Sequence, residues 1–308
     1  MTAPASLRIA LGQISSTTVP GENLLLVEQE VARAAAARAQ VLVLPEATMC
    51  RFGIPLHAVA EPLDGPWASR VLQLAADAGL TVVAGMFTPA GDGRVHNTVI
   101  AAGPTGLLGH YDKMHLYDAF GHRESDTVAS GTEPLTVDVD GVRIGVATCY
   151  DIRFPCLFTE LAARGALVTI VPASWGAGPG KLGQWTLLAR ARALDSTSFI
   201  VACGQAAPSG VTTTGVTPGA PPTGVGGSLV VSPLGQVRAA LGPAADFATV
   251  DLDLREVHGA RELIPVLADS ESVRMDTTTI PAGSSAPYRC RHRPVPQRSV
   301  RGRPHGWI

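Results

Sequence analysis

Residues 142–155 read VRIGVATCYDIRFP, and they place a cysteine, Cys149, directly after an apolar, strand-like run. Apolar and other side chains alternate along the first half of this stretch, which is typical of a half-buried strand. The dipeptide Asp140-Gly141 precedes it, and Asp-Gly suits a two-residue turn in which both residues take a positive φ. We therefore predict a β-hairpin of residues 135–139 and 142–148 that leads the chain into Cys149.

Runs of the same type recur on both sides of this hairpin and alternate with helical patterns. Gly-rich turns separate the runs between residues 80 and 112, which favours antiparallel neighbours and hence a mixed sheet. This alternation predicts an α/β fold. Strands are predicted at residues 7–13, 41–44, 80–87, 95–102, 107–112, 167–171, 198–203, 228–231 and 247–252, and helices at residues 24–35, 67–79, 157–163, 184–195 and 254–264.

The composition argues against several classes of partner. The chain has 24 Lys+Arg and 26 Asp+Glu, so its formal charge of -2 offers no electrostatic reason to expect nucleic acid or an anionic membrane. No apolar run approaches the length of a membrane span. Five scattered cysteines, without a CxxC pair or a recognisable secretory leader, favour neither a disulfide framework nor a zinc site. We expect free thiols, a cytoplasmic location and no metal or cofactor.

The apolar content also indicates how many domains the chain can form. With 46% apolar residues the chain can bury the core of one large domain, which we assign to residues 1–270. Residues 206–227 are crowded with Gly, Pro and Thr, a composition typical of a long surface loop. Residues 271–308 are rich in Pro, Ser and Arg and are predicted to form a tail.

Three chemically complementary residues each follow a strand-like run: Glu46, Lys113 and Cys149. Ends of strands are where α/β enzymes hold catalytic groups. A thiol becomes a strong nucleophile when it loses its proton, a carboxylate can accept that proton, and an ammonium group can stabilise an oxyanion. Taken singly, each has an ordinary explanation, namely a surface carboxylate, a solvated lysine and a small core residue.

The sequence motifs around these residues favour a catalytic role over these ordinary explanations, because the sequence resembles the nitrilase superfamily of carbon-nitrogen hydrolases. The resemblance lies in LPE at residues 44–46, YDKMHL at 111–116 and CYDIRFP at 149–155, in that order. His96-Asn97-Thr98 and Gln184-Trp185 add to it, and it extends over about residues 7–265.

The resemblance implies a Glu-Lys-Cys triad and a fold. Glu46 would be the general base, Lys113 the oxyanion stabiliser and Cys149 the nucleophile, while Tyr150 would give its backbone N–H to the same oxyanion. Glu124 is our candidate for the second, assisting glutamate of this family. The implied fold is a four-layer α-β-β-α sandwich with two mixed sheets, in a homodimer or a higher homo-oligomer.

The residues after Cys149 resemble the Nit and ω-amidase-like branch of the superfamily, which favours a small carboxamide over a nitrile as the substrate. Trp175 lies where the family lines its pocket and is a candidate substrate-binding residue. Arg153 is a second candidate, for a substrate carboxylate, although a salt bridge with Asp151 that structures the turn is its first expected role. Cys156 departs from the glutamate that is usual at this place.

Three other functions stay open. A Cys-His hydrolase would pair Cys149 with His115 or His122 and would leave Glu46 a structural role. An N-carbamoyl amine or amino-acid hydrolase would use the same fold and triad. A catalytically silent scaffold protein would be expected to lack a member of the triad, and none is missing.

Overall fold

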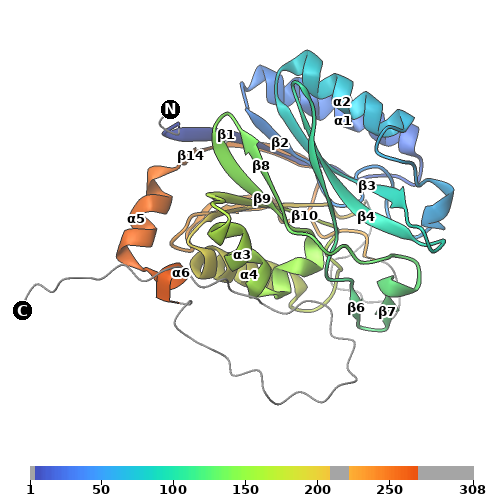
Figure 1. Cartoon of the computed structure of the whole chain (residues 1–308). Helices are drawn as coiled ribbons and strands as arrows, with labels where there is room; N and C mark the ends of the chain where they lie inside the picture. Colours follow the sequence, from blue (N-terminus) through green and yellow to red (C-terminus); the bar gives the residue numbers. More distant parts are fainter. Residues whose placement is uncertain (1–3, 209–221, 270–308) are drawn as a thin grey trace, which may run out of the picture.

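The computed structural model describes residues 4–208 and 222–269, which are coloured in Figure 1. The predicted tail at 271–308, and residues 209–221 of the predicted loop, lie outside the described residues. Within the described residues, no helix is both long enough and apolar enough to cross a membrane.

One six-stranded sheet carries the N-terminal half of the chain and one late strand. Strands β1, β2 and β3 run parallel, and the remaining pairs are antiparallel. The sheet is therefore mixed, as the sequence predicts. Its order is β14 (Asp246–Asp253), β1 (Ser6–Gln13), β2 (Val41–Val43), β3 (Thr81–Pro89), β4 (Val95–Gly103) and β5 (Gly106–Asp112).

A second six-stranded sheet holds the strand that leads to Cys149. Strands β9, β10 and β11 are parallel, and antiparallel strands flank them on both sides. The parallel centre brings the carboxyl ends of β9 and β10 to the same edge. The order is β13 (Val237–Ala240), β12 (Leu229–Val231), β11 (Phe199–Gly204), β10 (Val168–Ala173), β9 (Val142–Val146) and β8 (Leu135–Val139).

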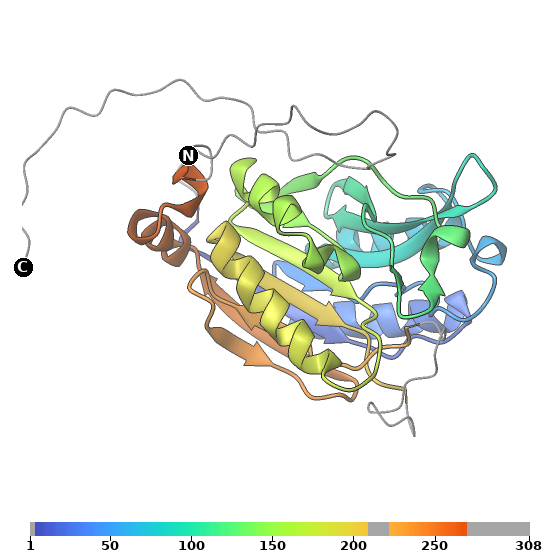
Figure 2. The ribbon, with the colours of Figure 1, turned by 90° about the horizontal axis from the view of Figure 1, so that it is seen from below.

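Helices cover the outer face of each sheet. In Figure 1, α1 (Pro20–Ala36) and α2 (Pro66–Ala78) lie above the first sheet, and α3 (Pro155–Ala163) and α4 (Lys181–Ser196) lie below the second. Figure 2 shows α3 and α4 from below, laid across the strands they cover. The short helices α5 (Arg255–Leu263) and α6 (Val266–Asp269) lie at one end of the sandwich, far from the small hairpin of β6 (Asp118–Ala119) and β7 (His122–Arg123).

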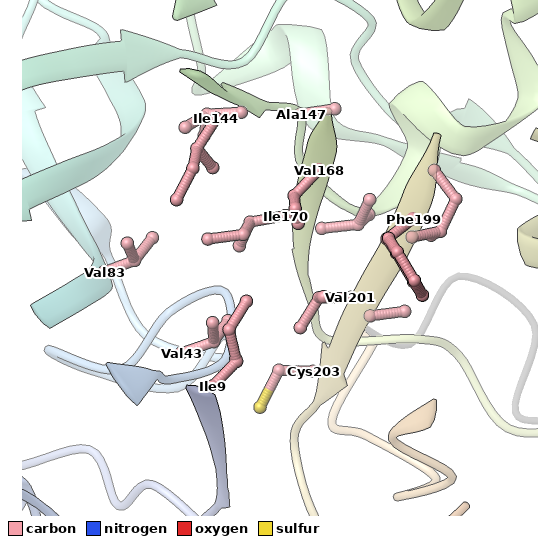
Figure 3. Close-up of a cluster of buried hydrophobic side chains, with 14 of the residues drawn as sticks. Ile9, Val43, Val83, Ile144, Ala147, Val168, Ile170, Phe199, Val201 and Cys203 are labelled. Carbon is pink, nitrogen blue, oxygen red and sulfur yellow. The ribbon is translucent and has the colours of Figure 1, made fainter. Parts of the chain in front are cut away.

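The main hydrophobic core fills the space between the two sheets. Period-two alternation sends every second side chain of a strand inward, so each sheet contributes branched apolar residues to this layer. Burial of one such side chain contributes about 1.5–3 kcal/mol to the free energy of folding. Figure 3 shows Ile9, Val43 and Val83 of the first sheet facing Ile144, Val168, Ile170 and Val201 of the second. The four-layer α-β-β-α sandwich is thereby confirmed.

The hairpin before Cys149 forms as the dipeptide predicts. Asp140 has a φ of 50° and Gly141 a φ of 81°, and Val139 pairs with Val142 across the turn. Both central residues of a type I′ turn need a positive φ, and this turn matches the right-handed twist of the strands that it joins. The register of β8 and β9, and so the position of Cys149, follows from this turn.

Candidate active site

Four predicted site residues lie together between the two sheets, and Lys113, Glu124 and Cys149 line one pocket there. Glu46 follows β2, Lys113 follows β5, Glu124 begins the 3₁₀ turn Glu124–Asp126, and Cys149 follows β9. Each is at most 6% exposed to solvent. The residues that line the narrow pocket are Phe52, Lys113, Tyr117, His122, Glu124, Cys149, Tyr150, Arg153, Ser174, Trp175, Gly176, Lys181 and Pro222.

The carboxylate of Glu46 is fixed on both oxygens. Its Oε1 accepts hydrogen bonds from Lys113 Nζ at 2.8 Å and from Asn97 Nδ2 at 2.7 Å. Its Oε2 accepts one from the backbone N–H of Ser174 at 2.7 Å. Three donors on one buried carboxylate leave it a single orientation, with the remaining acceptor capacity available for Cys149.

A close backbone contact sets the place of Glu46. The loop after β2 passes over Gly85 of β3, where an added Cβ would lie 2.6 Å from the backbone nitrogen of Ala47 and 3.0 Å from Cα of Glu46. Only glycine permits that approach. Ala47 itself has a φ of 57°, in the left-handed region that L-residues seldom adopt. We interpret the strained backbone at Ala47 as part of what orients the neighbouring Glu46 carboxylate.

Lys113 is paired with two carboxylates rather than one. Its Nζ lies 2.8 Å from Glu46 Oε1 and 2.9 Å from Glu124 Oε2. Burial opposes the charged form of the lysine, but Glu124 and Glu46 outweigh it and raise the pKa of Lys113 well above its usual value. The ammonium group is therefore charged throughout the neutral range. Glu124 in turn accepts a hydrogen bond from the backbone N–H of Tyr117 at 2.6 Å. It is therefore a fixed carboxylate of the site and not an exposed loop residue like its neighbour Arg123.

Cys149 occupies a strained turn of the type that presents a nucleophile. Its φ is 49°, and it begins the 3₁₀ helix Cys149–Arg153. At the N-terminus of this helix the Asp151 carboxylate accepts a hydrogen bond from the backbone N–H of Thr148. Its thiol lies close enough to Glu46 for that carboxylate to act on its charge state. Burial, followed by the negative charge of Glu46, raises the pKa of Cys149 well above the ordinary value. At rest the group is a thiol, and its proton lies beside a carboxylate that can accept it.

Asp151 connects the cysteine turn to the lysine segment. Its Oδ2 accepts hydrogen bonds from Tyr111 OH and the backbone N–H of Thr148, both at 2.8 Å. Its Oδ1 contacts the backbone N–H and Nδ1 of His115, at 3.0 and 2.7 Å. The expected Asp151–Arg153 salt bridge is therefore wrong, because these other donors occupy both oxygens. His115 is committed to Asp151 and stacks on Phe154 with ring centroids 3.7 Å apart.

The other candidates also line the pocket. Tyr150 follows Cys149 directly. Trp175 is 4% exposed, and its Nε1 donates to the backbone carbonyl of Lys181 at 2.9 Å. Arg153 is half-buried and donates from Nη2 to Gln184 Oε1 at 2.7 Å. His122 of the Cys-His alternative lines the pocket as well.

Three participants were given no role from the sequence, although Asn97 stands in one of the motifs that carry the resemblance. Asn97 donates to Glu46 and, at 3.1 Å, to Glu124, and a polar side chain within the apolar run of β4 was the signal for it. The backbone N–H of Ser174 had no side-chain signal at all. Lys181 follows a Gly-rich loop, and only the tertiary fold brings it to the pocket.

The described cysteines differ in state. Cys50, Cys149 and Cys203 are free and buried. Cys156 is disulfide-bonded, so the expectation of free thiols throughout is wrong at this position. No cluster of three or more His, Cys, Asp or Glu residues suited to a metal ion occurs in the part of the chain that the structure describes.

With two mixed sheets that enclose buried carboxylate, ammonium and thiol groups, the fold and the pocket define an enzyme of the nitrilase type. The family model described as carbon-nitrogen hydrolase matches residues 8–262, and the chain belongs to that family. The resemblance found in the sequence is thus confirmed.

Similar proteins point to the amidases within this family. A protein of Mycobacterium tuberculosis named only as a hydrolase is 58% identical over 274 residues, which is 88% of this chain and 98% of that one. Deaminated glutathione amidase of Escherichia coli O157:H7 is 31% identical, over 84% and 95% of the two chains. Omega-amidases lie further away in the same set.

A solved structure supports the same grouping. A glutamate-to-glutamine mutant of the amidase of Nesterenkonia sp. AN1, from the nitrilase superfamily, matches with a TM-score of 0.69 and 27% identity over 84% of this chain and 98% of that one, and in that mutant acrylamide has added to the active-site cysteine.

Proposed function

We propose that this protein hydrolyses a small carboxamide to an acid and ammonia, with Glu46, Lys113 and Cys149 as its catalytic triad. One observation carries the proposal: the buried Glu46 carboxylate accepts a hydrogen bond from the Lys113 ammonium and lies near enough to the buried Cys149 thiol to influence its proton. A base, an electrophile and a nucleophile gathered in one pocket are what acyl transfer through a covalent intermediate requires. The amidase relatives support the choice of an amide.

The first half of the reaction forms a thioester. Glu46 accepts the Cys149 proton while the sulfur attacks the carbonyl carbon. The oxyanion that develops is stabilised by the Lys113 ammonium and the backbone N–H of Tyr150. When the tetrahedral intermediate collapses, the C–N bond breaks and Glu46 passes the proton to the departing nitrogen, which leaves as ammonia.

The second half returns the free enzyme. Glu46 removes a proton from water, the resulting hydroxide attacks the thioester carbonyl, and the same two donors stabilise the oxyanion. The C–S bond then breaks, and the Cys149 sulfur takes its proton back from Glu46 as the acid leaves. Glu124 accepts hydrogen bonds from Lys113 and from Asn97, the same amide that binds Glu46. We therefore assign to Glu124 the role of positioning Lys113.

The test is a substrate screen with detection of the intermediate. Short primary amides, dicarboxylate monoamides and N-carbamoyl amino acids are incubated with the protein, and ammonia release and the intact mass are measured. We expect ammonia from the amides and an acyl mass increment on Cys149 that Cys149→Ala abolishes. The Cys50→Ala variant removes another buried free thiol and should keep the increment.

Two results would contradict the proposal. Turnover of the carbamoyl compounds alone would assign the protein to the N-carbamoyl hydrolases. Absence of any adduct and any product across the screen would favour the silent scaffold. The expected homo-oligomer and the cytoplasmic location stay predictions; a monomer mass in sedimentation velocity would exclude the first.

A further inference from the structure

Gln205 is a buried glutamine that joins the second sheet to the loop that carries Glu46. It follows β11 directly and is 2% exposed. Its Nε2 donates hydrogen bonds to the backbone oxygen of Glu46 at 3.1 Å and to that of Ala47 at 3.3 Å. The main chain of the general base is therefore held from the other sheet, in addition to the donors on its carboxylate.

The neighbours of the Gln205 amide determine which way it points. Its Oε1 accepts a hydrogen bond from the backbone N–H of Ser16 at 3.0 Å, and its Nε2 also donates to Ser16 Oγ at 2.7 Å. Two carbonyl oxygens thus lie on the nitrogen side of the amide, and an N–H donor lies on the oxygen side. A flipped amide would set its oxygen against both carbonyl oxygens, so one orientation alone satisfies these partners.

Side chains also bind the remaining backbone oxygens of this loop. Ser16 Oγ donates to the backbone oxygen of Thr48 at 3.2 Å, and Thr48 Oγ1 donates to that of Pro45 at 2.6 Å. Together with the amide of Gln205, these hydroxyls give every backbone oxygen of residues 45–48 a side-chain donor. A buried loop outside helices and sheets needs such partners, because its carbonyl groups have no other strand or helical turn to pair with.

The backbone of Gln205 supports the same glutamate from a second direction. Its N–H donates to the backbone oxygen of Ala173, the last residue of β10, at 2.8 Å. The next residue along the chain is Ser174, whose backbone N–H donates to Glu46 Oε2 at 2.7 Å. Gln205 thus contacts the main chain of Glu46 directly and holds in place the strand end that presents a donor to its carboxylate.

We propose that Gln205 is a positioning residue for the general base, whose side-chain amide keeps the loop of Glu46 at the distance that proton transfer from Cys149 requires. This inference rests on the proposed amide hydrolysis. Gln205 does not line the pocket, so it acts through Glu46 and not on the substrate. Ala47 has a φ of 57°, a conformation that persists where its surroundings impose it. A shift of about 1 Å at a reacting group can lower the rate by roughly 100-fold.

Two substitutions of Gln205 test this role. Gln205→Met keeps the length of the side chain but removes its donor and its acceptor. Gln205→Glu keeps an acceptor for the N–H of Ser16 and turns an oxygen towards the carbonyl groups of Glu46 and Ala47. If the donor half of the amide holds the loop, both variants lose activity alike.

The matched control is Gln13→Met. Gln13 is a glutamine buried to the same degree, at 1% exposure, and it also joins distant segments. Its Nε2 donates to the backbone oxygen of Gly242 at 2.8 Å, and its Oε1 accepts a hydrogen bond from the backbone N–H of Ser228 at 2.9 Å. Among the described residues, none of its side-chain hydrogen bonds goes to residues 45–48. Its loss should lower the melting temperature without moving Glu46.

We expect Gln205→Met and Gln205→Glu to lower kcat for a primary amide by roughly 10- to 100-fold. KM should stay within threefold of the wild type, because the interaction that is lost acts on the transition state. Gln13→Met should keep both constants within threefold. A kcat within threefold of the wild type in Gln205→Met, or an equal fall in Gln13→Met, would overturn the positioning role.

A milder variant decides the matter if Gln205→Met does not fold. Ser16→Ala removes the hydroxyl that lies between Gln205 and Thr48 and leaves the rest of the loop intact. We expect its kcat to fall about three- to tenfold at unchanged KM, the range of a single hydrogen bond. An unchanged kcat in Ser16→Ala would then overturn the inference.

Crystal structures of the wild type and Gln205→Met separate this inference from the catalytic proposal, since they need no turnover. We expect the Glu46 carboxylate to move by at least about 0.5 Å, the tolerance of a catalytic group. A displaced Glu46 in a protein whose wild type hydrolyses no amide would refute the proposed function and leave the positioning role standing. Amide hydrolysis by the wild type with Glu46 undisplaced in the variant would do the reverse.

Discussion

Replacement of Glu46 by glutamine is the sharpest test of the site, because the carboxylate has three donors around it. Lys113 Nζ and Asn97 Nδ2 point at one oxygen and the backbone N–H of Ser174 at the other. Whichever way the new amide lies, its NH₂ group faces a donor. One buried polar clash of this kind costs on the order of 1–3 kcal/mol of the free energy of unfolding.

The loss of the base acts on the rate in addition. A positioned general base contributes roughly 10²- to 10⁴-fold, and the amide of glutamine cannot accept the Cys149 proton. We therefore expect Glu46→Gln to acylate at least about 100-fold more slowly than the wild type, while Cys149 remains in place. Quench-flow with a primary amide, followed by intact-protein mass, measures this step directly.

The control is Glu133→Gln, the same change at an exposed glutamate that lines no part of the pocket. It should acylate as the wild type does and melt at the same temperature. If Glu46→Gln acylated within threefold of the wild type while His115→Ala abolished acylation, the triad would be refuted and the Cys-His alternative preferred.

Three further outcomes are expected. Gly85→Ala forces the loop of Glu46 away from β3, so kcat should fall by tenfold or more in steady-state assays; an unchanged kcat would show that the loop tolerates the shift. Gly141→Ala places a side chain at a φ of 81°, far from the pocket, and should lower the free energy of unfolding by about 1 kcal/mol in urea titrations with activity unchanged. Burial raises the pKa of Cys203 to about 12, so its contribution to stability is full below its unfolded pKa near 9 and is lost as the pH rises towards 12. Cys203→Ala should therefore flatten the decline in the free energy of unfolding between these two pH values. An equally steep decline in the variant would contradict the raised pKa of Cys203.

Much of the fold follows from local pattern. The strand and helix ranges predicted around Cys149 agree with the structure to within a few residues at most ends, because each element buries one face and so repeats with a period of 2 or 3.6. The short strands β6, β7 and β13 were missed. A pair of two-residue strands and a largely exposed edge strand carry too few alternating residues to stand out.

The site residues likewise divide into those that the sequence predicts and those that only the tertiary structure brings together. Glu46, Lys113 and Cys149 could be named from the sequence because each stands in its own motif at the end of a strand. The Asp151–Arg153 pairing was wrong because two neighbours along a helix were assumed to be partners, whereas Tyr111 and His115 reach Asp151 from a different sheet. Contacts between segments distant in the chain have no local signature.

The sequence by itself determined the class of fold, the hairpin before Cys149 and the three reactive groups, since periodicity, turn chemistry and motif are properties of short segments. Only the tertiary structure decided that Glu46 and Glu124 share Lys113, that Asn97 bridges the two carboxylates and that Lys181 and Arg153 share the pocket wall. The physical reason is that a charge acts over a few ångströms of space, and the packing of the two sheets sets those distances.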